Sequence, residues 1–158
     1  MVHSRHTNTW SMEIAGVVVG DHGQYQCQAP TSTGVRTNSY WLRVRQPSLV
    51  ILGSREKHVT LGDTIAMTCE LRDSGENTEH LTWVHNNDLV RGQDRVTVSS
   101  TVIKSQPRNL STRERKIFLS ELKILKTKLT DSGNYSCSTS SLSSEATTLF
   151  VSPGRNIP

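Results

Sequence analysis

The sequence predicts an all-β fold that contains two copies of one strand–corner–strand module. Residues 12–27 read MEIAGVVVGDHGQYQC, and residues 122–137 read LKILKTKLTDSGNYSC. Both segments carry two apolar residues separated by one residue, followed by Asp, Gly, Tyr and Cys at alternate positions. Every matched pair is 110 residues apart (137 − 27 = 110). Six matches at one offset indicate an internal repeat.

The spacing within the module explains why it forms strands. In the second copy, Leu122 and Ile124 put two apolar side chains on one face of a strand, because side chains alternate across a strand. Tyr135 and Cys137 do the same on a second strand. Residues 130–133 between them read TDSG, in which Asp can bond the backbone ahead of it and Gly tolerates a sharp corner.

Alternating patterns predict three strands around the first copy. Trp10, Met12 and Ile14 alternate with polar residues, and Tyr40 and Leu42 do so further along the chain. Residues 1–7 are polar and are expected to be unstructured. The strands are expected over residues 9–14, 24–29 and 37–45.

Gln46 and Pro47 mark a boundary, because proline cannot donate to a β-ladder and stiffens the join. The same alternation continues after it, with Ile65, Met67 and Cys69 on one face of a strand. Residues 99–115 are expected to form a long polar connection. Strands are expected over residues 48–52, 58–61, 64–71, 81–85, 86–90, 95–98, 116–124, 136–141 and 146–151.

The Asp-x-Gly-x-Tyr-x-Cys pattern after an apolar strand resembles the corner between strands E and F of an immunoglobulin domain. The resemblance implies a β-sandwich in which the hydroxyl of a corner tyrosine, Tyr135 or Tyr25, bonds the backbone a few residues upstream. It also implies an inter-sheet disulfide between Cys69 and Cys137. Trp83 lies 14 residues after Cys69 (83 − 69 = 14), the spacing of the core tryptophan that packs on this disulfide.

Only the second copy has enough chain in front of it for a whole immunoglobulin domain of about 100 residues. We therefore expect an immunoglobulin-like β-sandwich, in which one complete domain follows the C-terminal part of another. The expected bounds are 1–46 for a partial domain with strands E, F and G, 47–153 for a complete domain, and 154–158 for a tail. Three cysteines leave one over, so Cys27 is expected to be unpaired.

In many such domains an arginine at the start of strand D pairs with the corner aspartate. This pair maps by resemblance onto Arg95 and Asp131. A carboxylate that accepts both an arginine fork and backbone N–H groups makes a strong interaction. The residues expected to be structural rather than catalytic are Cys69, Cys137, Trp83, Tyr135, Asp131, Arg95 and Tyr25.

The expected compartment is extracellular, because a structural disulfide persists only where conditions are oxidising. The opening residues MVHSRHTNTW contain no apolar signal-peptide core, and the chain has no apolar run of 18 residues. We therefore expect the start to be internal to a longer protein, or the chain to be truncated. The net charge of +4 favours acidic partners at long range, but no motif for nucleic-acid binding is present.

Two Asn-x-Ser sequons, at Asn109 and Asn134, predict a glycoprotein if the chain enters the secretory pathway. Asn109 lies in the expected polar connection. Asn134 precedes the inward Tyr135, so alternation along the strand points its side chain outward.

No motif for catalysis, metal binding or cofactor binding is found. The sequence has no framed nucleophile, no HExxH, no phosphate-binding loop and no zinc-type Cys/His spacing, and His3 and His6 lack fixed companions. We therefore expect no enzyme activity, cofactor or metal, and no small-molecule substrate.

The order of several sequence blocks narrows the resemblance. WSMEI and DHGQYQCQAPT are followed directly by ILGSREKHVTLGD, LTWVHNNDLV and DSGNYSC. This order resembles the invertebrate defective-proboscis-extension-response (dpr) family of neuronal two-immunoglobulin-domain surface proteins and their nematode zwei-Ig relatives. The resemblance implies cell adhesion in neuronal wiring at the synapse, with the first domain's C, C′, F and G strands docking an immunoglobulin domain of the dpr-interacting-protein type.

By the same resemblance, the outward positions of strands F and G belong to that interface: Gln24, Gln26, Gln28, Trp41 and Arg43. Strands C and C′, which would supply the rest, are absent from the sequence, so binding by this chain is expected to be impaired. Submicromolar binding to the family partner would contradict this expectation.

Two alternatives stay open. One is a secreted module that binds sulfated, heparan-type glycans through Lys123, Lys126, Lys128 and Arg113. The other is a fragment with no function of its own.

Overall fold

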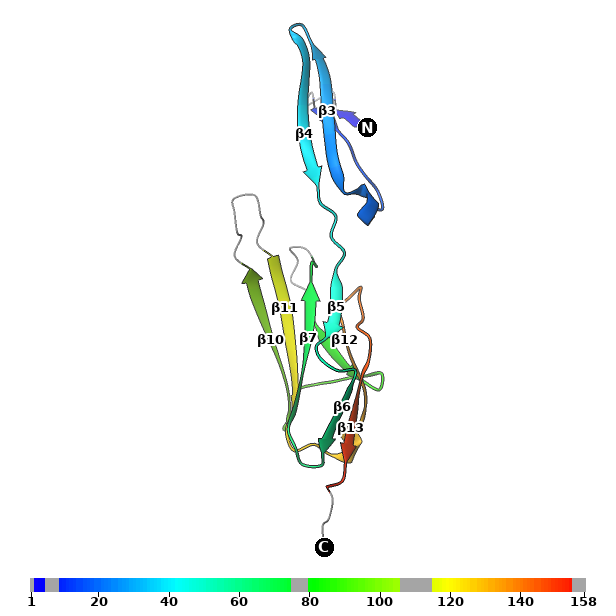
Figure 1. Ribbon diagram of the computed structural model, residues 1–158, viewed down its shortest axis with the longest axis vertical. Coiled ribbons are helices and arrows are strands. Elements are labelled where there is room, and N and C mark those ends of the chain that lie inside the picture. Colours follow the sequence, from blue (N-terminus) through cyan, green and yellow to red (C-terminus); the bar gives the residue numbers. More distant parts are fainter. Residues whose placement is uncertain (1, 5–8, 75–79, 106–114, 155–158) are drawn as a thin grey trace. The chain divides into compact units, whose positions relative to one another are not determined.

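The computed structural model describes residues 2–4, 9–74, 80–105 and 115–154. They belong to two compact units, Met1–Gln46 and Pro47–Pro158. Strands make up most of the described residues in both units, and the helical segments among them are two short 3₁₀ turns (Figure 1).

The first unit is built from two antiparallel strand pairs, β1 with β2 and β3 with β4. Its elements are β1 (Val2–Ser4), β2 (Thr9–Ser11), the 3₁₀ turn η1 (Val19–Asp21), β3 (Gly23–Thr31) and β4 (Gly34–Leu42).

Three predictions for this unit need correction. The expected unstructured start was wrong for Val2–Ser4, which pairs with β2. The strand expected over residues 9–14 ends at Ser11, because no neighbour in the described part of the chain pairs with residues 12–14. The strand expected over residues 37–45 begins earlier, at Gly34, and ends at Leu42, where the hairpin ladder with Gly23 closes.

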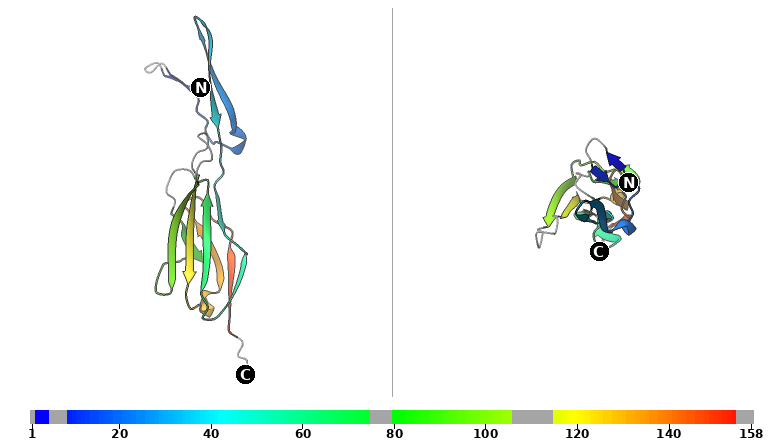
Figure 2. Two further views of the ribbon diagram at one scale, coloured as in Figure 1. Left: turned by 60° about the vertical axis from the view of Figure 1, so that its left-hand side comes forward. Right: turned by 90° about the horizontal axis from the view of Figure 1, so that it is seen from above.

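The second unit is a two-layer sandwich, in which one sheet has the strand order β10-β11-β7-β5 and the other β6-β13-β12-β8-β9. Figure 2 shows the two layers from another side. The predicted all-β sandwich is confirmed. The strands are β5 (Ser48–Ile51), β6 (Glu56–Thr60), β7 (Ile65–Arg72), β8 (Thr82–His85), β9 (Asp88–Leu89), β10 (Val96–Ser105), β11 (Arg115–Ile124), β12 (Gly133–Ser138) and β13 (Thr147–Ser152), with the 3₁₀ turn η2 (Leu129–Asp131) before β12.

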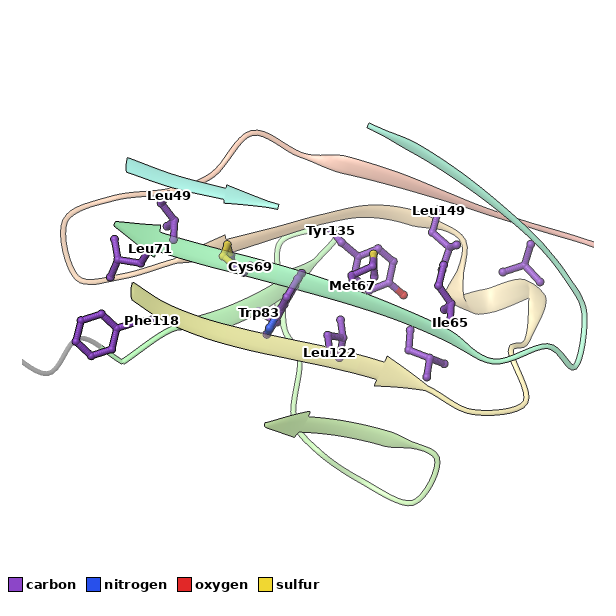
Figure 3. Close-up of a cluster of buried hydrophobic side chains, with 13 residues drawn as sticks. Leu49, Ile65, Met67, Cys69, Leu71, Trp83, Phe118, Leu122, Tyr135 and Leu149 are labelled. Carbon is purple, nitrogen blue, oxygen red and sulfur yellow. A yellow bond between two sulfur atoms is a disulfide. The ribbon is translucent and has the colours of Figure 1, made fainter. Parts of the chain in front are cut away.

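The core between the sheets follows from the period-two patterns of the strands. On β7, Ile65, Met67, Cys69 and Leu71 are buried while the residues between them are less so, as expected when one face of a strand meets the core. The opposite sheet contributes Trp83, Tyr135 and Leu149, which Figure 3 labels, and also Cys137. Burying a large apolar side chain contributes roughly 1.5–3 kcal/mol, so this core supplies the unit's main stabilisation.

Strand β10 differs most from its prediction. The sequence placed a strand at residues 95–98 and a polar connection at 99–115, which was wrong for residues 99–105. β10 runs on to Ser105 and pairs residue by residue with β11. Strand preference depends on the cross-strand neighbour, and here Ser100 lies opposite Ser120 and Thr101 opposite Leu119. A long antiparallel hairpin therefore forms the outer half of this sheet.

Candidate functional site

The two copies of the repeat build the same corner. In the first unit the Tyr25 hydroxyl donates to the Asp21 carbonyl at 2.9 Å, and in the second unit the Tyr135 hydroxyl donates to the Asp131 carbonyl at 2.7 Å. Each tyrosine thereby fastens the start of its strand to the 3₁₀ turn before it. The chain thus contains two tyrosine corners of one geometry.

The corner aspartates also bond alike. The Val18 backbone N–H donates to Asp21 Oδ2 at 2.8 Å, and the Lys128 backbone N–H donates to Asp131 Oδ2 at 2.7 Å. Side-chain bonds of this kind satisfy the backbone donors that a short turn leaves unpaired. The internal repeat therefore extends from the sequence pattern to the hydrogen bonds.

The hairpin β3–β4 has two faces, which its register defines. Gln24 lies opposite Trp41, and Tyr25 lies opposite Tyr40, so these pairs occupy alternate faces. Gln26 and Gln28 share the face of Gln24, and all of them are exposed. We name this face, comprising Gln24, Gln26, Gln28 and Trp41, the glutamine face.

An aromatic side chain dominates the glutamine face. The Trp41 side chain is 67% exposed, and its ring centroid lies 6.4 Å from that of His22. A large exposed aromatic among glutamine amides has the composition of a protein-binding surface, because such surfaces are enriched in tryptophan and tyrosine.

A groove of about 890 Å³ lies beside the hairpin. Its lining includes Met12, Ile14, Tyr25, Cys27 and Tyr40, and also Gln26, Gln28 and Trp41 of the glutamine face. Tyr40 and Met12 are more than half exposed, although Leu122, the match of Met12 in the repeat, is fully buried. Cys27 is exposed and carries a free thiol.

In the second unit the residue equivalent to Cys27 is buried and bonded. Cys137 of β12 forms a disulfide with Cys69 of β7, which joins the two sheets. Beside it the indole N–H of Trp83 donates to Ser120 Oγ at 3.0 Å, from one sheet to the other. Since Trp83 is paired with Cys137 and Ser120 with Cys69, the disulfide and this hydrogen bond are adjacent links between the sheets.

The corner of the second unit has an additional ion pair. Arg95 donates to Asp131 through Nη1 at 2.5 Å and Nη2 at 2.6 Å. Burial raises the pKa of the Asp131 carboxyl, but hydrogen bonds from Arg95 and from the Lys128 N–H, with the charge of Arg95, outweigh it and hold that pKa below its ordinary value. Burial, followed by the charge of Asp131, raises the pKa of Tyr135. At neutral pH this corner therefore contains an ionised Asp131 carboxylate and a neutral Tyr135 hydroxyl.

Sequence reasoning missed two residues that hold this corner and one that links the two sheets. Asn86 Oδ1 accepts the Asn134 backbone N–H at 2.9 Å, and the His85 ring stacks on Tyr135 at 4.3 Å. Ser120 is the buried acceptor for Trp83. The signal for Ser120 was its position in the inward register of β11, between apolar Phe118 and Leu122. No sequence signal pointed to Asn86 or His85.

A model of the family described as "Immunoglobulin domain" matches residues 46–141. The chain belongs to the immunoglobulin domain family. The matched segment covers the disulfide, Trp83 and the Tyr135 corner of the second unit, so the resemblance drawn from the sequence is confirmed at the level of this family.

Relatives of this immunoglobulin chain are much longer proteins. Mouse hemicentin-2 is 33% identical over 73 residues, which are 46% of this chain and 1% of that protein. The mouse protein named cell adhesion molecule-related/down-regulated by oncogenes is 26% identical over 94 residues, which are 59% of this chain and 7% of that protein. The chain thus spans a small fraction of these relatives, one of which is named for cell adhesion.

Among solved structures, a chain of Dpr2 Ig1-Ig2 in complex with DIP-Theta Ig1-Ig3 matches with a TM-score of 0.53 at 19% identity. The match covers 97% of this chain and 72% of that chain. At this identity the likeness shows the immunoglobulin fold alone.

The structure places the remaining predicted residues as follows. Arg43 lies one residue beyond the end of β4, so it is outside the ladder that places Trp41 opposite Gln24. Asn134 is exposed, and its Oδ1 accepts the Thr148 hydroxyl at 2.9 Å. Asn109 lies outside the described residues.

The basic residues considered for glycan binding lie on β11 and in the turn that follows it, where the structure describes them. Lys123 lies on β11, and Lys126 and Lys128 follow in the turn before η2. All three are exposed, whereas Arg113 lies outside the described residues. Over residues 2–4, 9–74, 80–105 and 115–154, no helix has the length and apolar character needed to cross a membrane.

Proposed function

We propose that this chain is part of an extracellular recognition protein of the dpr type, which binds an immunoglobulin-domain partner through the glutamine face of its first unit and performs no catalysis. The observation that carries the proposal is the combination of two equivalent tyrosine corners with an exposed Trp41 on the hairpin of the first corner. Adhesion in neuronal wiring is the role that this proposal assigns.

The first unit, in this proposal, is the part of an immunoglobulin domain that contains strands E, F and G, with 47–153 as the complete domain. The groove beside Tyr25 and Cys27 supports this assignment, because the equivalent face in the second unit is covered by β7 and β11. Cys27 then corresponds to Cys137. In the second unit Cys137 is bonded to Cys69, whereas Cys27 carries a free thiol. The second sheet of the first domain would cover the groove.

The Dpr2 structure supports the choice of partner. That structure contains two-immunoglobulin-domain Dpr2 bound to DIP-Theta Ig1-Ig3, and it covers nearly all of this chain. A pair of strands with glutamines and an exposed tryptophan offers amide hydrogen bonds around an aromatic anchor, which suits a protein surface. The disulfide between Cys69 and Cys137 supports an oxidising, extracellular setting.

The test is surface plasmon resonance against DIP-Theta Ig1-Ig3. The chain alone is expected not to bind with submicromolar affinity, because the glutamine face is only part of the proposed interface. The decisive sample is Dpr2 Ig1-Ig2 in which residues 23–42 of this chain replace the corresponding F and G strands. We expect this chimaera to bind, with a loss of at least about tenfold when Trp41 is changed to alanine, as for a hot-spot aromatic.

The matched control is Val35→Ala in the same chimaera, which removes a side chain as exposed as Trp41 but lies near the turn of the hairpin, beyond the glutamine face. It is expected to leave binding unchanged. A correctly folded chimaera that fails to bind, or that binds equally with Trp41→Ala, would refute the proposed surface.

A further inference from the structure

Strand β10 of the second unit is an edge strand with one side unpaired by any other described strand. It pairs with β11 along its 10 residues, and the sheet order places it at the end of β10-β11-β7-β5 (Figure 1). An edge strand presents a row of backbone N–H and C=O groups that another strand can use.

The composition of β10 gives little protection against such pairing. Its residues read VTVSSTVIKS, with no proline and a single charge, at Lys104. Proteins commonly protect a bare edge with proline, a bulge, inward charges or a short strand, and none of these is present along β10. Val98, Val102 and Ile103 are 38%, 46% and 48% exposed, although β-branched apolar residues usually lie against neighbours in a sheet.

We propose that β10 pairs antiparallel with β10 of a second copy of this chain, in a two-fold arrangement centred on Ser100. A two-fold axis perpendicular to the sheet keeps each face of β10 on the same side in both copies. Directly opposite residues then have numbers of equal parity, and centring on Ser100 pairs almost the whole strand. The two four-stranded sheets become one continuous sheet of two copies.

The inner face of β10 is self-complementary in this register. Val98 of one copy lies opposite Val102 of the other, and each is already paired within its own copy, with Leu122 and Phe118 respectively. On each side of the two-fold axis a row of four apolar side chains therefore crosses from one copy to the other. Leu122 and Val98 come from one copy, and Val102 and Phe118 come from its partner. Cross-strand apolar pairs of this kind stabilise sheets. The half-exposed valines become covered.

The residues at the centre of β10 and on its outer face are also compatible with this register. Ser100 meets its own symmetry mate, flanked on each side by Ser120. On the outer face Thr97 lies opposite Ile103, which is another pair of β-branched residues, and Ser99 lies opposite Thr101, which is a pair of hydroxyl side chains. The single charge, Lys104, lies opposite Val96 rather than its own mate, so like charges are not opposed across the joint.

A second copy is the occupant that these observations favour over an unrelated strand. When two copies of β10 pair antiparallel, apolar residues lie opposite apolar residues on the inner face and the serines meet at the centre. An unrelated strand would do so only if it carried the same pattern. The proposal is independent of the glutamine face, since it concerns only the second unit.

The first test uses cysteine crosslinking on the full chain in a Cys27→Ser background, with oxidised glutathione as the oxidant. Ser100→Cys puts two thiols directly opposite each other at the axis, where the Cα separation suits a disulfide. Ser99→Cys is the matched control, because in this register its two copies lie two residues out of step, beyond disulfide reach. A covalent dimer with Ser100→Cys and none with Ser99→Cys is expected. Equal crosslinking of both variants, or of neither, would overturn the register.

The second test measures association by sedimentation equilibrium up to about 1 mM, where weak dimers are detected. The Cys27→Ser chain is expected to dimerise, and Val102→Lys is expected to raise the dimer dissociation constant at least about tenfold, because an edge lysine opposes strand pairing. Val50→Lys is the control: it changes a similarly exposed valine on the other edge strand, β5, and is expected to leave the dimer intact. Thermal melting of each variant establishes that it is folded. A monomer throughout this range, or equal effects of the two lysines, would overturn the proposal.

Discussion

Arg95 and Asp131 form a two-point ion pair that ties the residue before β10 to the corner before β12. Both nitrogens of the guanidinium fork reach the carboxylate, at 2.5 and 2.6 Å, and Asp131 also accepts the Lys128 N–H. The side chains are only 25% and 11% exposed. The carboxylate is therefore held by three donors in a setting that water reaches poorly, and it links two strands that belong to different sheets.

Removing the arginine is expected to destabilise the second unit. Arg95→Ala leaves Asp131 partly buried with one backbone donor, and a hydrogen bond to a charged group contributes about 1.5–3 kcal/mol. We expect the free energy of unfolding to fall by about 2 kcal/mol, measured by urea denaturation with tryptophan fluorescence.

The control for this prediction is Arg72→Ala. Arg72 also forms a two-point pair, with Glu70, but its side chain is 55% exposed. Exposed ion pairs contribute little to stability because water screens them, so this change is expected to lower the free energy of unfolding much less. Equal decreases in the free energy of unfolding for the two variants would show that the buried corner pair stabilises the unit no more than an exposed pair does.

The stability of the second unit is expected to depend on pH through Asp131. Its folded pKa lies below the ordinary value of 3.8, so the unfolded chain binds this proton more readily. The contribution is fully present above the unfolded pKa and is lost as the pH falls through the folded pKa. Unfolding free energies of wild type and Asp131→Asn, compared between about pH 7 and pH 2.5, are expected to converge as the pH decreases. A difference that stays constant over this range would contradict the assigned role of the charge.

The hydrogen bond between Trp83 and Ser120 gives a third prediction. Both side chains are buried, so Ser120→Ala would leave the indole N–H without an acceptor. An unsatisfied buried donor costs about 1–3 kcal/mol. Urea denaturation is expected to show a loss of that size. Ser100→Ala, at the exposed cross-strand neighbour of Ser120, is expected to change little, and a similar loss there would argue for a general effect of serine removal in this sheet.

Fixed spacings explain which parts of the fold could be predicted from the sequence. The corner is local: Asp131 and Tyr135 are four residues apart, and the pattern that encodes them occurs twice. The positions of Cys69 and Trp83 follow from spacings characteristic of immunoglobulin domains. Such features need no knowledge of the rest of the fold.

The features that could not be predicted depend on contacts between distant segments. Ser99 and Ser100 have a weak intrinsic preference for strands. They are part of β10 because they pair with the facing residues of β11. Asn86 acts on a residue 48 positions away, and its own sequence context indicates only a turn. The end of β4, and with it the place of Arg43, depends on where the hairpin partner Gly23 begins.

Gly133 is expected to be intolerant of any side chain. Its φ is +140°, which L residues rarely adopt, and a Cβ there would lie 2.5 Å from both Nδ2 and Oδ1 of Asn86. Asn86 cannot move away without losing its bond to the Asn134 N–H. Backbone strain alone costs about 1–3 kcal/mol, and the clash adds to it. Gly133→Ala is therefore expected to lower the free energy of unfolding by more than about 2 kcal/mol in urea denaturation.

The control separates strain from the clash. Gly62, in the same unit, has a φ of +90° but open space around its Cα, so Gly62→Ala introduces backbone strain without a collision. It is expected to cost less than Gly133→Ala. In a double-mutant cycle, Asn86→Ala is expected to reduce the cost of Gly133→Ala, because the atoms that the new Cβ would strike are gone. Additive effects of Asn86→Ala and Gly133→Ala would show that the two residues do not contact as described, and that strain at Gly133 is sufficient to explain its intolerance.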